Sequence, residues 1–365
     1  MIPIEYYRQV FYIVLSICLF FMVRPIFYFT NYQNSYRSIL KFNSALVLLI
    51  IIGFIGLRDP FGNWRYFGDS YRYTLDFLDL YNGYLFEDIK DYGFYFFTKF
   101  ISQTGSLGFY YLLCALIYVM LPYKAYKKWL NYNAFYVLLL HVTSISFWGF
   151  GINGIRNGLA VSILLFSFSF ADKKKLFYYA LIIIAISFHK SVILPAFVFL
   201  FFRRYNNTGI LIKIWLFAVV FSFLFGSRLN DFFENNINLF NLIDERGNTY
   251  FSGKVDDVKL ATNFRFDFII YSGLPILLGY ICVIKKGFND VFYTSILNTY
   301  IITNIFWVLM IYAAYTNRIA YLSWFLMPLV MIYPLLKSKL FKNQKYLIGY
   351  LVFGSLFFTL ILEFL

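Results

Sequence analysis

The chain has 365 residues, of which 61% are hydrophobic and 24% aromatic, and its mean hydropathy is +0.66. This balance excludes an ordinary soluble protein, because apolar runs about as long as a bilayer is thick recur along the sequence. The formal net charge of +14 could indicate nucleic-acid binding, but the basic residues cluster between apolar runs, so we expect no nucleic-acid partner.

The apolar runs predict an all-α, polytopic integral membrane protein with about twelve transmembrane helices in a single domain over residues 1–365. The predicted helices cover residues 7–29, 39–57, 106–123, 133–150, 154–171, 176–189, 190–202, 210–226, 264–284, 291–312, 318–336 and 346–364. Two longer external segments are expected, at about 58–105 and 227–263. Within the first, the run 93–105 is predicted to form an interfacial or re-entrant helix.

Basic clusters occupy alternate connections between these helices. They contain Arg37 and Lys41, Lys124, Lys127 and Lys128, residues 173–175, residues 203–204, Lys285 and Lys286, and Lys337, Lys339, Lys342 and Lys345. The positive-inside rule assigns these connections to the cytoplasm, so both termini are predicted to face outside.

The run from Lys175 to Arg203 is read as a short hairpin. A single helix over 176–202 would be about 40 Å long and would place two basic clusters on opposite sides of the membrane. We therefore predict a tip near His189-Lys190-Ser191, below the outer surface. Irregular backbone at that depth lines a cavity or is buried in protein.

Charged and aromatic side chains alternate in LRDPFGNWRYFGDSYRYTLDF, residues 57–77. The forked guanidinium of Arg58 suits phosphate, and a carboxylate such as Asp69 can accept a hydroxyl proton. The alternative is a solvated interfacial loop with internal ion pairs and an aromatic belt.

Arg156 lies in GINGIRNGLAVS, residues 151–162, among small and apolar residues. An arginine within a membrane costs at least ~2.5–3.5 kcal/mol, so a functional role with a nearby partner is the default interpretation. The alternatives are that it snorkels to the outer headgroups or pairs structurally with an acid of the first external segment.

Two histidines are present. His141 lies in the middle of a predicted helix and is expected to be a hydrogen-bonded structural residue. His189 lies at the predicted hairpin tip, where a neutral imidazole would suit general-base chemistry.

Two more arginines, Arg265 and Arg318, begin predicted helices at the outer face. With Arg58 and Arg156 they make a positive outer surface that predicts an anionic ligand. No P-loop, GxGxxG run or His/Cys cluster with metal-ligand spacing occurs, so we expect no cofactor. We also expect no metal, because arginines could take its place beside an anionic ligand.

Several short motifs then follow one another in a recognisable order. They are Arg58, Gly68-Asp69 and Tyr71; Asp91-Tyr92-Gly93; Gly154, Arg156 and Ala160; Ala185, His189 and Ser191; and Asn317, Arg318 and Tyr321. This order, from about residue 45 to 335, resembles the EpsG/Wzy-like exopolysaccharide and O-antigen polymerases of bacterial inner membranes. Family members often carry Glu-Pro-Gly where this chain has Asp91-Tyr92-Gly93, so we assign Asp91 no role.

The resemblance implies a glycosyltransferase of the inner membrane whose active site faces the periplasm, and a GT-C-like architecture is compatible with it. A growing glycan on undecaprenyl diphosphate would move onto the terminal sugar of another undecaprenyl-diphosphate-linked repeat unit, without a nucleotide sugar. The substrate-binding residues would be Arg58, Arg156, Arg265, Arg318, Tyr71 and Tyr321. A chain-length regulator protein is an expected partner.

Several alternatives stay open at this point. The general base is Asp69 or His189, and the outcome at the anomeric carbon is inverting or retaining. An O-antigen-ligase-like glycosyltransferase would use the same donor with another acceptor. A flippase for lipid-linked oligosaccharides would need charges along a path through the bilayer, whereas here they collect at one face.

Overall fold

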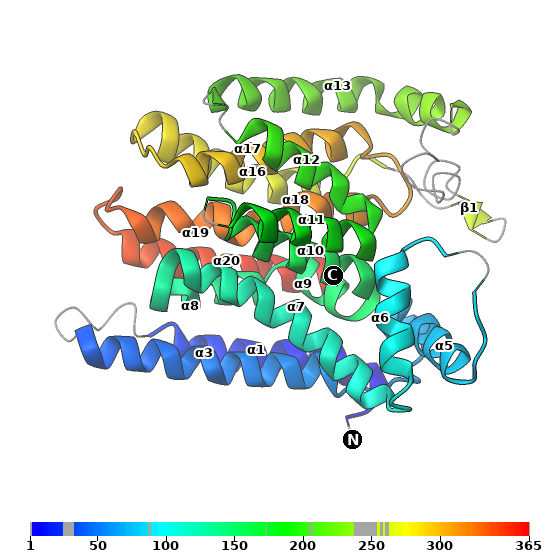
Figure 1. Ribbon diagram of the computed structural model, residues 1–365. Helices are drawn as coiled ribbons and strands as arrows, with labels where there is room; N and C mark the ends of the chain where they lie inside the picture. Colours follow the sequence, from blue (N-terminus) through cyan, green and yellow to red (C-terminus); the bar gives the residue numbers. More distant parts are fainter. Residues whose placement is uncertain are drawn as a thin grey trace. The chain divides into compact units, whose positions relative to one another are not determined.

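The structure is a computed structural model (Figure 1), and it describes residues 2–24, 33–86, 89–172, 174–203, 205, 207–236, 254–255, 258–259 and 263–364. The chain divides into two compact units. The first comprises Met1–His189 and Leu335–Leu365, and the second comprises Lys190–Pro334. The single multi-spanning domain proposed from the sequence stays a prediction.

The first unit is helical. Its elements are η1 (Ile4–Tyr6), α1 (Tyr7–Met22), α3 (Gln33–Gly56), α4 (Trp64–Phe67), α5 (Ser70–Tyr81), α6 (Tyr92–Ser102), α7 (Leu107–Leu130), η2 (Asn131–Asn133), α8 (Ala134–Val142), α9 (Ile145–Trp148), the π-helix η3 (Gly149–Asn153), α10 (Ile155–Phe168), α11 (Lys175–Phe188) and α20 (Gln344–Phe364). Helix α7 packs against α3 and α10, and α10 packs against α11. Helices α5 and α6 lie together beside one end of α7 (Figure 1).

The second unit is built around helix α17 (Val291–Leu309), which carries several buried polar side chains. Its elements are η4 (Lys190–Val192), α12 (Ile193–Phe202), α13 (Thr208–Asn235), β1 (Lys254–Val255), β2 (Val258–Lys259), α16 (Phe266–Tyr280), the π-helix η5 (Ile281–Lys285), α17 (Val291–Leu309), α18 (Thr316–Trp324) and α19 (Met327–Lys337), the last of which extends past the unit boundary. The strands β1 and β2 form a short antiparallel pair. Helix α17 contacts α12, α13, α16 and α18. The Trp215 indole N–H donates to the buried Asn304 amide oxygen at 2.7 Å, and the Asn304 amide nitrogen donates to Ser323 Oγ at 2.9 Å, so hydrogen bonds join three helices.

Within the described residues, eight helices are long and apolar enough to cross a membrane, and nine if the bent pair Ile145–Asn153 and Ile155–Phe168 is one span. The predicted class, an all-α polytopic membrane protein, is therefore confirmed. The count of about twelve spans is not. The predicted helices 106–123 and 133–150 contribute to one continuous candidate span, Leu107–Val142, and those at 176–189 and 190–202 are shorter apolar helices.

Some helix ends differ from their predicted positions. Helix α7 continues to Leu130 through its lysine cluster, because positively charged side chains near the carboxyl end of a helix interact favourably with the helix dipole and do not end the helix. Helix α13 continues to Asn235, into the predicted external segment 227–263. Most of the rest of that segment, and residues 25–29 of the predicted first helix, lie outside the described residues.

The helix predicted at 93–105 is present as α6, and the helix predicted at 176–189 ends where the sequence indicates. Helix α11 stops at Phe188, and His189 has extended backbone angles. The depth of this break in the membrane stays a prediction. His141 is a hydrogen-bonded core residue as predicted, with Nδ1 2.9 Å from the Tyr126 hydroxyl.

Candidate functional site

Five of the predicted site residues belong to the first unit: Arg58, Asp69, Tyr71, Arg156 and His189. Gly56, near the end of α3, lies against Leu112 near the start of α7. Helices α10 and α11 pack together and are joined by a short connection, so the start of α10 lies at the same end of the pair as the end of α11. The segments that connect the helices make further contacts that hold these residues near one another.

The backbone before Arg156 is sharply bent. The helical segments on either side of Gly154 differ in direction by 119°. A Cβ atom at Gly158 would lie 2.5 Å from the Phe150 carbonyl oxygen, and one at Gly151 would lie 2.9 Å from the Ile55 side chain. These glycines therefore permit the close backbone approach that their small size predicts. The bend sets Arg156 in the first turn of α10.

Arg156 pairs with an acid of the first external segment. Its Nη1 atom donates to Oδ2 of Asp91 at 3.1 Å, and the side chains are 27% and 6% exposed. The guanidinium carbon also lies 5.6 Å from the centroid of the Tyr73 ring. Its buried Nε atom has no hydrogen-bond partner among the described residues. Asp91 thus holds one side of the Arg156 guanidinium, which stays partly exposed to solvent and keeps an N–H group that can still donate a hydrogen bond.

The turn containing Asp91 also contacts the end of α11. Asp91 occupies the position before the first residue of α6. A Cβ atom at Gly93 would clash with the Ser187 hydroxyl and come within 2.9 Å of the Ser187 carbonyl carbon. Phe188 packs against Phe97 with ring centroids 5.6 Å apart. The turn therefore links Arg156 to the segment that carries His189, which is itself buried.

A hydrogen bond to the backbone of Asp69 holds this residue in place. Its N–H group donates to Oδ1 of Asn153 at 2.8 Å, immediately before the bend at Gly154. Gly68 has a φ of +56°, and a Cβ atom there would clash with the Asn153 side chain. Only glycine suits both conditions, so the Gly68-Asp69 motif has a structural reason. The first external segment is thereby tied to the arginine-bearing bend.

Arg58 is buried, with 3% of the residue exposed. Its Nη2 atom donates to Ser70 Oγ at 2.9 Å, its Nη1 atom donates to the Ile55 carbonyl, and its guanidinium lies 4.1 Å above the Tyr111 ring. Burial lowers the pKa of this guanidinium, although arginine stays protonated in proteins. In this conformation Arg58 connects the end of α3 to α5 and α7.

Asp76, on α5, lies near the Arg156 guanidinium. Partial burial raises the pKa of this carboxyl, while the charge of Arg156 lowers it, and burial is the larger effect. Tyr71, on the same helix, is 41% exposed and can offer an aromatic face to a ligand.

The other predicted residues belong to the second unit. Arg265 makes a two-pronged contact with Asp267, with Nε–Oδ1 and Nη2–Oδ2 distances of 2.9 and 2.6 Å, and lies 3.6 Å above the Phe268 ring. Arg318 lies 5.0 Å from the Tyr315 ring centroid, and Tyr321 is buried with its hydroxyl 3.4 Å from Asn317. Their roles in substrate binding stay predictions.

Two residues that sequence reasoning assigned no role are central to this geometry, Asp91 and Asn153. The sequence allows Arg156 to pair with an acid of the first external segment, but it does not identify which acid. The turn at residues 91–93 points to Asp91 as a site residue, but this signal is weak because the turn departs from the Glu-Pro-Gly pattern. Among the described residues, no group of three or more His, Cys, Asp or Glu side chains could hold a metal ion.

Comparisons with known proteins identify the family of the chain. No curated protein and no solved structure gave a significant match. A model of the EpsG family matches residues 44–364, which include every predicted site residue. The chain therefore belongs to the EpsG family, and this membership indicates a polysaccharide polymerase of the membrane.

Proposed function

We propose that the protein extends a bacterial polysaccharide at the periplasmic face of the inner membrane. A growing glycan carried on undecaprenyl diphosphate would be transferred to the terminal sugar of another lipid-linked repeat unit. The observation that carries the proposal is Arg156, a partly exposed cation at the start of a membrane helix, fixed by Asp91 and with an unused buried Nε–H group. An arginine held in this way suits a diphosphate ligand.

The proposed step forms one bond and breaks one. The acceptor hydroxyl oxygen attacks the anomeric carbon of the donor sugar, and the bond from that carbon to the diphosphate oxygen breaks. The electron pair leaves with the lipid diphosphate, while the hydroxyl proton passes to a base. Arg156 would stabilise the negative charge that develops on the leaving group. This displacement would invert the anomeric centre, although a retaining route would use the same donor.

The residues around Arg156 have different proposed roles. Asp91 is a positioning residue that directs the guanidinium, and Tyr71 offers its ring to a sugar. We assign Arg58 to positioning as well, since its donors are directed to internal partners in this conformation. Within the second unit, Arg265, Arg318 and Tyr321 remain proposed substrate contacts. A chain-length regulator remains a proposed partner.

The base is proposed to be Asp69 or His189, and two variants that remove one basic side chain each separate them. Asp69→Asn and His189→Asn each remove basicity while keeping a polar side chain. The variant that lacks the base should lose polymerisation by about 10²–10⁴-fold, the usual contribution of general-base catalysis, and the other should retain most of it. Equal, small effects of both would exclude these two residues as the base.

The test of the function is surface-glycan length in cells that lack their own copy of the gene. These cells are complemented at matched protein levels with wild type, Arg156→Ala, or the control Arg65→Ala, which removes an exposed arginine of the first external segment. We expect long glycans with wild type and Arg65→Ala, and single repeat units with Arg156→Ala. Long glycans with Arg156→Ala would refute the diphosphate role. Loss of all surface glycan, with lipid-linked units retained inside, would indicate a flippase.

A further inference from the structure

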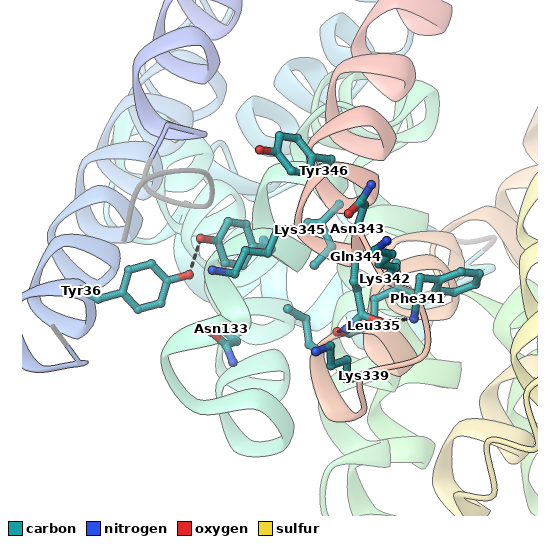
Figure 2. A pocket seen from close by; sticks show the side chains of 13 residues that line it. Tyr36, Asn133, Leu335, Lys339, Phe341, Lys342, Asn343, Gln344, Lys345 and Tyr346 are labelled. Atoms are coloured by element: carbon teal, nitrogen blue, oxygen red, sulfur yellow. Dashed lines mark hydrogen bonds between the residues drawn. The ribbon is translucent and has the colours of Figure 1, made fainter. Parts of the chain in front are cut away.

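A second site lies in the first unit, at the other end of α3 from Arg58. A cavity of about 530 Å³ opens where the first turns of α3, α8 and α20 meet the end of α19 (Figure 2). Tyr36 and Tyr136 form one wall, with their hydroxyl oxygens 2.6 Å apart. Asn133 and Asn343 add amide groups to the lining.

The cavity has the charge of an anion-binding site. Three lysines line it, Lys339, Lys342 and Lys345, and none of the lining residues is acidic. In the part of the chain that the structure describes, none of the three is paired with a carboxylate. Figure 2 shows the side chains of Lys339 and Lys345 extending toward Asn133 and Tyr36. An anion that entered would meet ammonium, amide and phenol donors together.

The loop that carries the lysines is held in shape by one side chain, that of Gln344. Its amide nitrogen donates to the carbonyls of Leu335 and Ser338, the latter at 2.8 Å. Its amide oxygen accepts from the backbone N–H groups of Leu340 and Phe341, at 2.8 and 3.2 Å. A loop fixed by four hydrogen bonds loses little further entropy when a ligand binds.

An open apolar groove continues from the cavity along α20. It shares Phe341, Lys342, Asn343 and Tyr346 with the cavity and adds Leu347 and Tyr350, with a volume of about 580 Å³. The Tyr350 side chain is 69% exposed, on a helix that is a candidate membrane span. A ligand with a charged head and an apolar tail would fill both spaces.

The position of the cavity along α3 indicates which side of the membrane it faces. Tyr36 lies in the first turn of α3, whereas Arg58 follows its last residue. Twenty residues of helix separate the two ends by about 30 Å, the thickness of the hydrocarbon core. The cavity and the candidate site therefore lie at opposite ends of a candidate span. The lysine loop is at the end that the positive-inside rule assigns to the cytoplasm.

We propose that this cavity binds the phosphate of an anionic phospholipid of the cytoplasmic leaflet, with an acyl chain in the groove along α20. The apolar groove favours a lipid over free phosphate, because soluble phosphate has no tail to occupy it. A second basic cavity of about 360 Å³, lined by Arg37, Lys41 and Lys127, opens beside the same turn, η2, and extends the positive surface. The proposal does not depend on the polymerase activity.

The test uses the full-length protein in phosphatidylcholine nanodiscs that contain a small fraction of spin-labelled phosphatidylglycerol. The motionally restricted fraction gives the selectivity for phosphatidylglycerol over spin-labelled phosphatidylcholine. Each lysine near an anionic headgroup is expected to contribute about fivefold in affinity. Lys339→Gln/Lys342→Gln/Lys345→Gln should therefore lose selectivity by about tenfold or more, while the three Lys→Arg replacements together should keep it.

The matched control is Lys213→Gln/Lys285→Gln/Lys286→Gln, which removes three exposed charges from the second unit and should keep the selectivity. An equal loss in this control would show diffuse attraction and overturn the proposal, as would full selectivity in the first variant. If the triple variant aggregates, Lys339→Gln alone should still lower selectivity several-fold. Displacement of phosphatidylglycerol by millimolar inorganic phosphate would assign the site to a soluble anion instead.

Discussion

Arg156 Nη1 lies 3.1 Å from Asp91 Oδ2, and this contact joins the first turn of α10 to the residue before α6. The carboxylate is almost fully buried while the arginine is 27% exposed, so the acid is the fixed partner. An acid in this position lowers the cost of keeping an arginine within a membrane. It also leaves the open side of the guanidinium for a ligand.

The first prediction concerns this pair. Asp91→Asn keeps the shape but removes the charge, and we expect shorter glycans together with a loss of stability of at most about 3 kcal/mol, since the arginine is partly solvated. Arg156→Lys should keep the charge but not the fork, and should also shorten the glycan.

A double-mutant cycle distinguishes positioning from direct chemistry. If Asp91 acts through Arg156, then Asp91→Ala adds nothing to the glycan defect of Arg156→Ala, and the two effects are fully non-additive. Glycan length at matched protein level is the readout. Additive effects would mean that Asp91 acts on the substrate independently, and the positioning role would be abandoned.

The second prediction concerns Gly68. Its φ of +56° and the nearby Asn153 side chain both disfavour alanine. Gly68→Ala should therefore break the hydrogen bond from the Asp69 backbone N–H to the Asn153 side chain. Gly83→Ala is a matched control, because Gly83 has a φ of +90° but open space around the missing Cβ. Both variants should lose about 1–3 kcal/mol from backbone strain.

Only Gly68→Ala should also shorten the glycan. Thermal unfolding of the purified protein gives the stability, and complementation gives the glycan length. Asn153→Ala should reproduce the glycan defect without the backbone strain. If Asn153→Ala leaves the glycan at full length, the contact has no part in holding the site.

The third prediction concerns Gly93. A methyl group there meets the Ser187 hydroxyl and, at 2.9 Å, the Ser187 carbonyl carbon, so α6 must move away from the end of α11. Overpacking of this kind costs about 1–3 kcal/mol. Adding Ser187→Gly removes the side-chain clash but not the backbone contact, so it should restore only part of the lost stability and glycan length. Complete restoration would show that only the side chain limits the approach.

Much of this fold could be predicted from hydrophobic runs and charge clusters. The predicted bounds of α10, α11, α16 and α20 agree with the structure within a few residues, because the length of an apolar run is a strong signal in membrane proteins. The number of spans could not be predicted as well. The lysine cluster of α7 resembles a connection between helices, although basic residues are also favoured in the last turn of a helix.

The site was predicted only in part, for a physical reason. Arg156 is conspicuous because its charge is costly among apolar residues. Asp91 is not, since an acid in an external segment resembles any solvated acid until the fold brings a cation to it. Asn153 acts through a hydrogen bond to a backbone group 84 positions earlier in the chain. Such pairings depend on tertiary contacts that no local pattern contains.

The last prediction concerns pH. Burial raises the pKa of Asp76 above its ordinary value of 3.8, so the folded state disfavours its ionised form. The protonated Asp76 carboxyl therefore contributes its full stability below the pKa it has in the unfolded chain. This contribution is lost as the pH rises through the pKa of the carboxyl in the folded protein. Asp76→Asn stays neutral, so its unfolding temperature should fall less than that of wild type as the pH rises from about 4 toward neutrality.

The control is Asp231→Asn, which removes an exposed carboxylate from α13 and should keep the wild-type pH dependence. Thermal unfolding at a series of pH values in one ionic strength separates the two variants. The nearby Arg156 opposes the effect of burial, so Asp76→Asn in an Arg156→Ala background should show a larger benefit at neutral pH. An Asp76→Asn variant that is less stable than wild type at neutral pH would mean that the charge of Arg156, rather than burial, dominates this carboxyl.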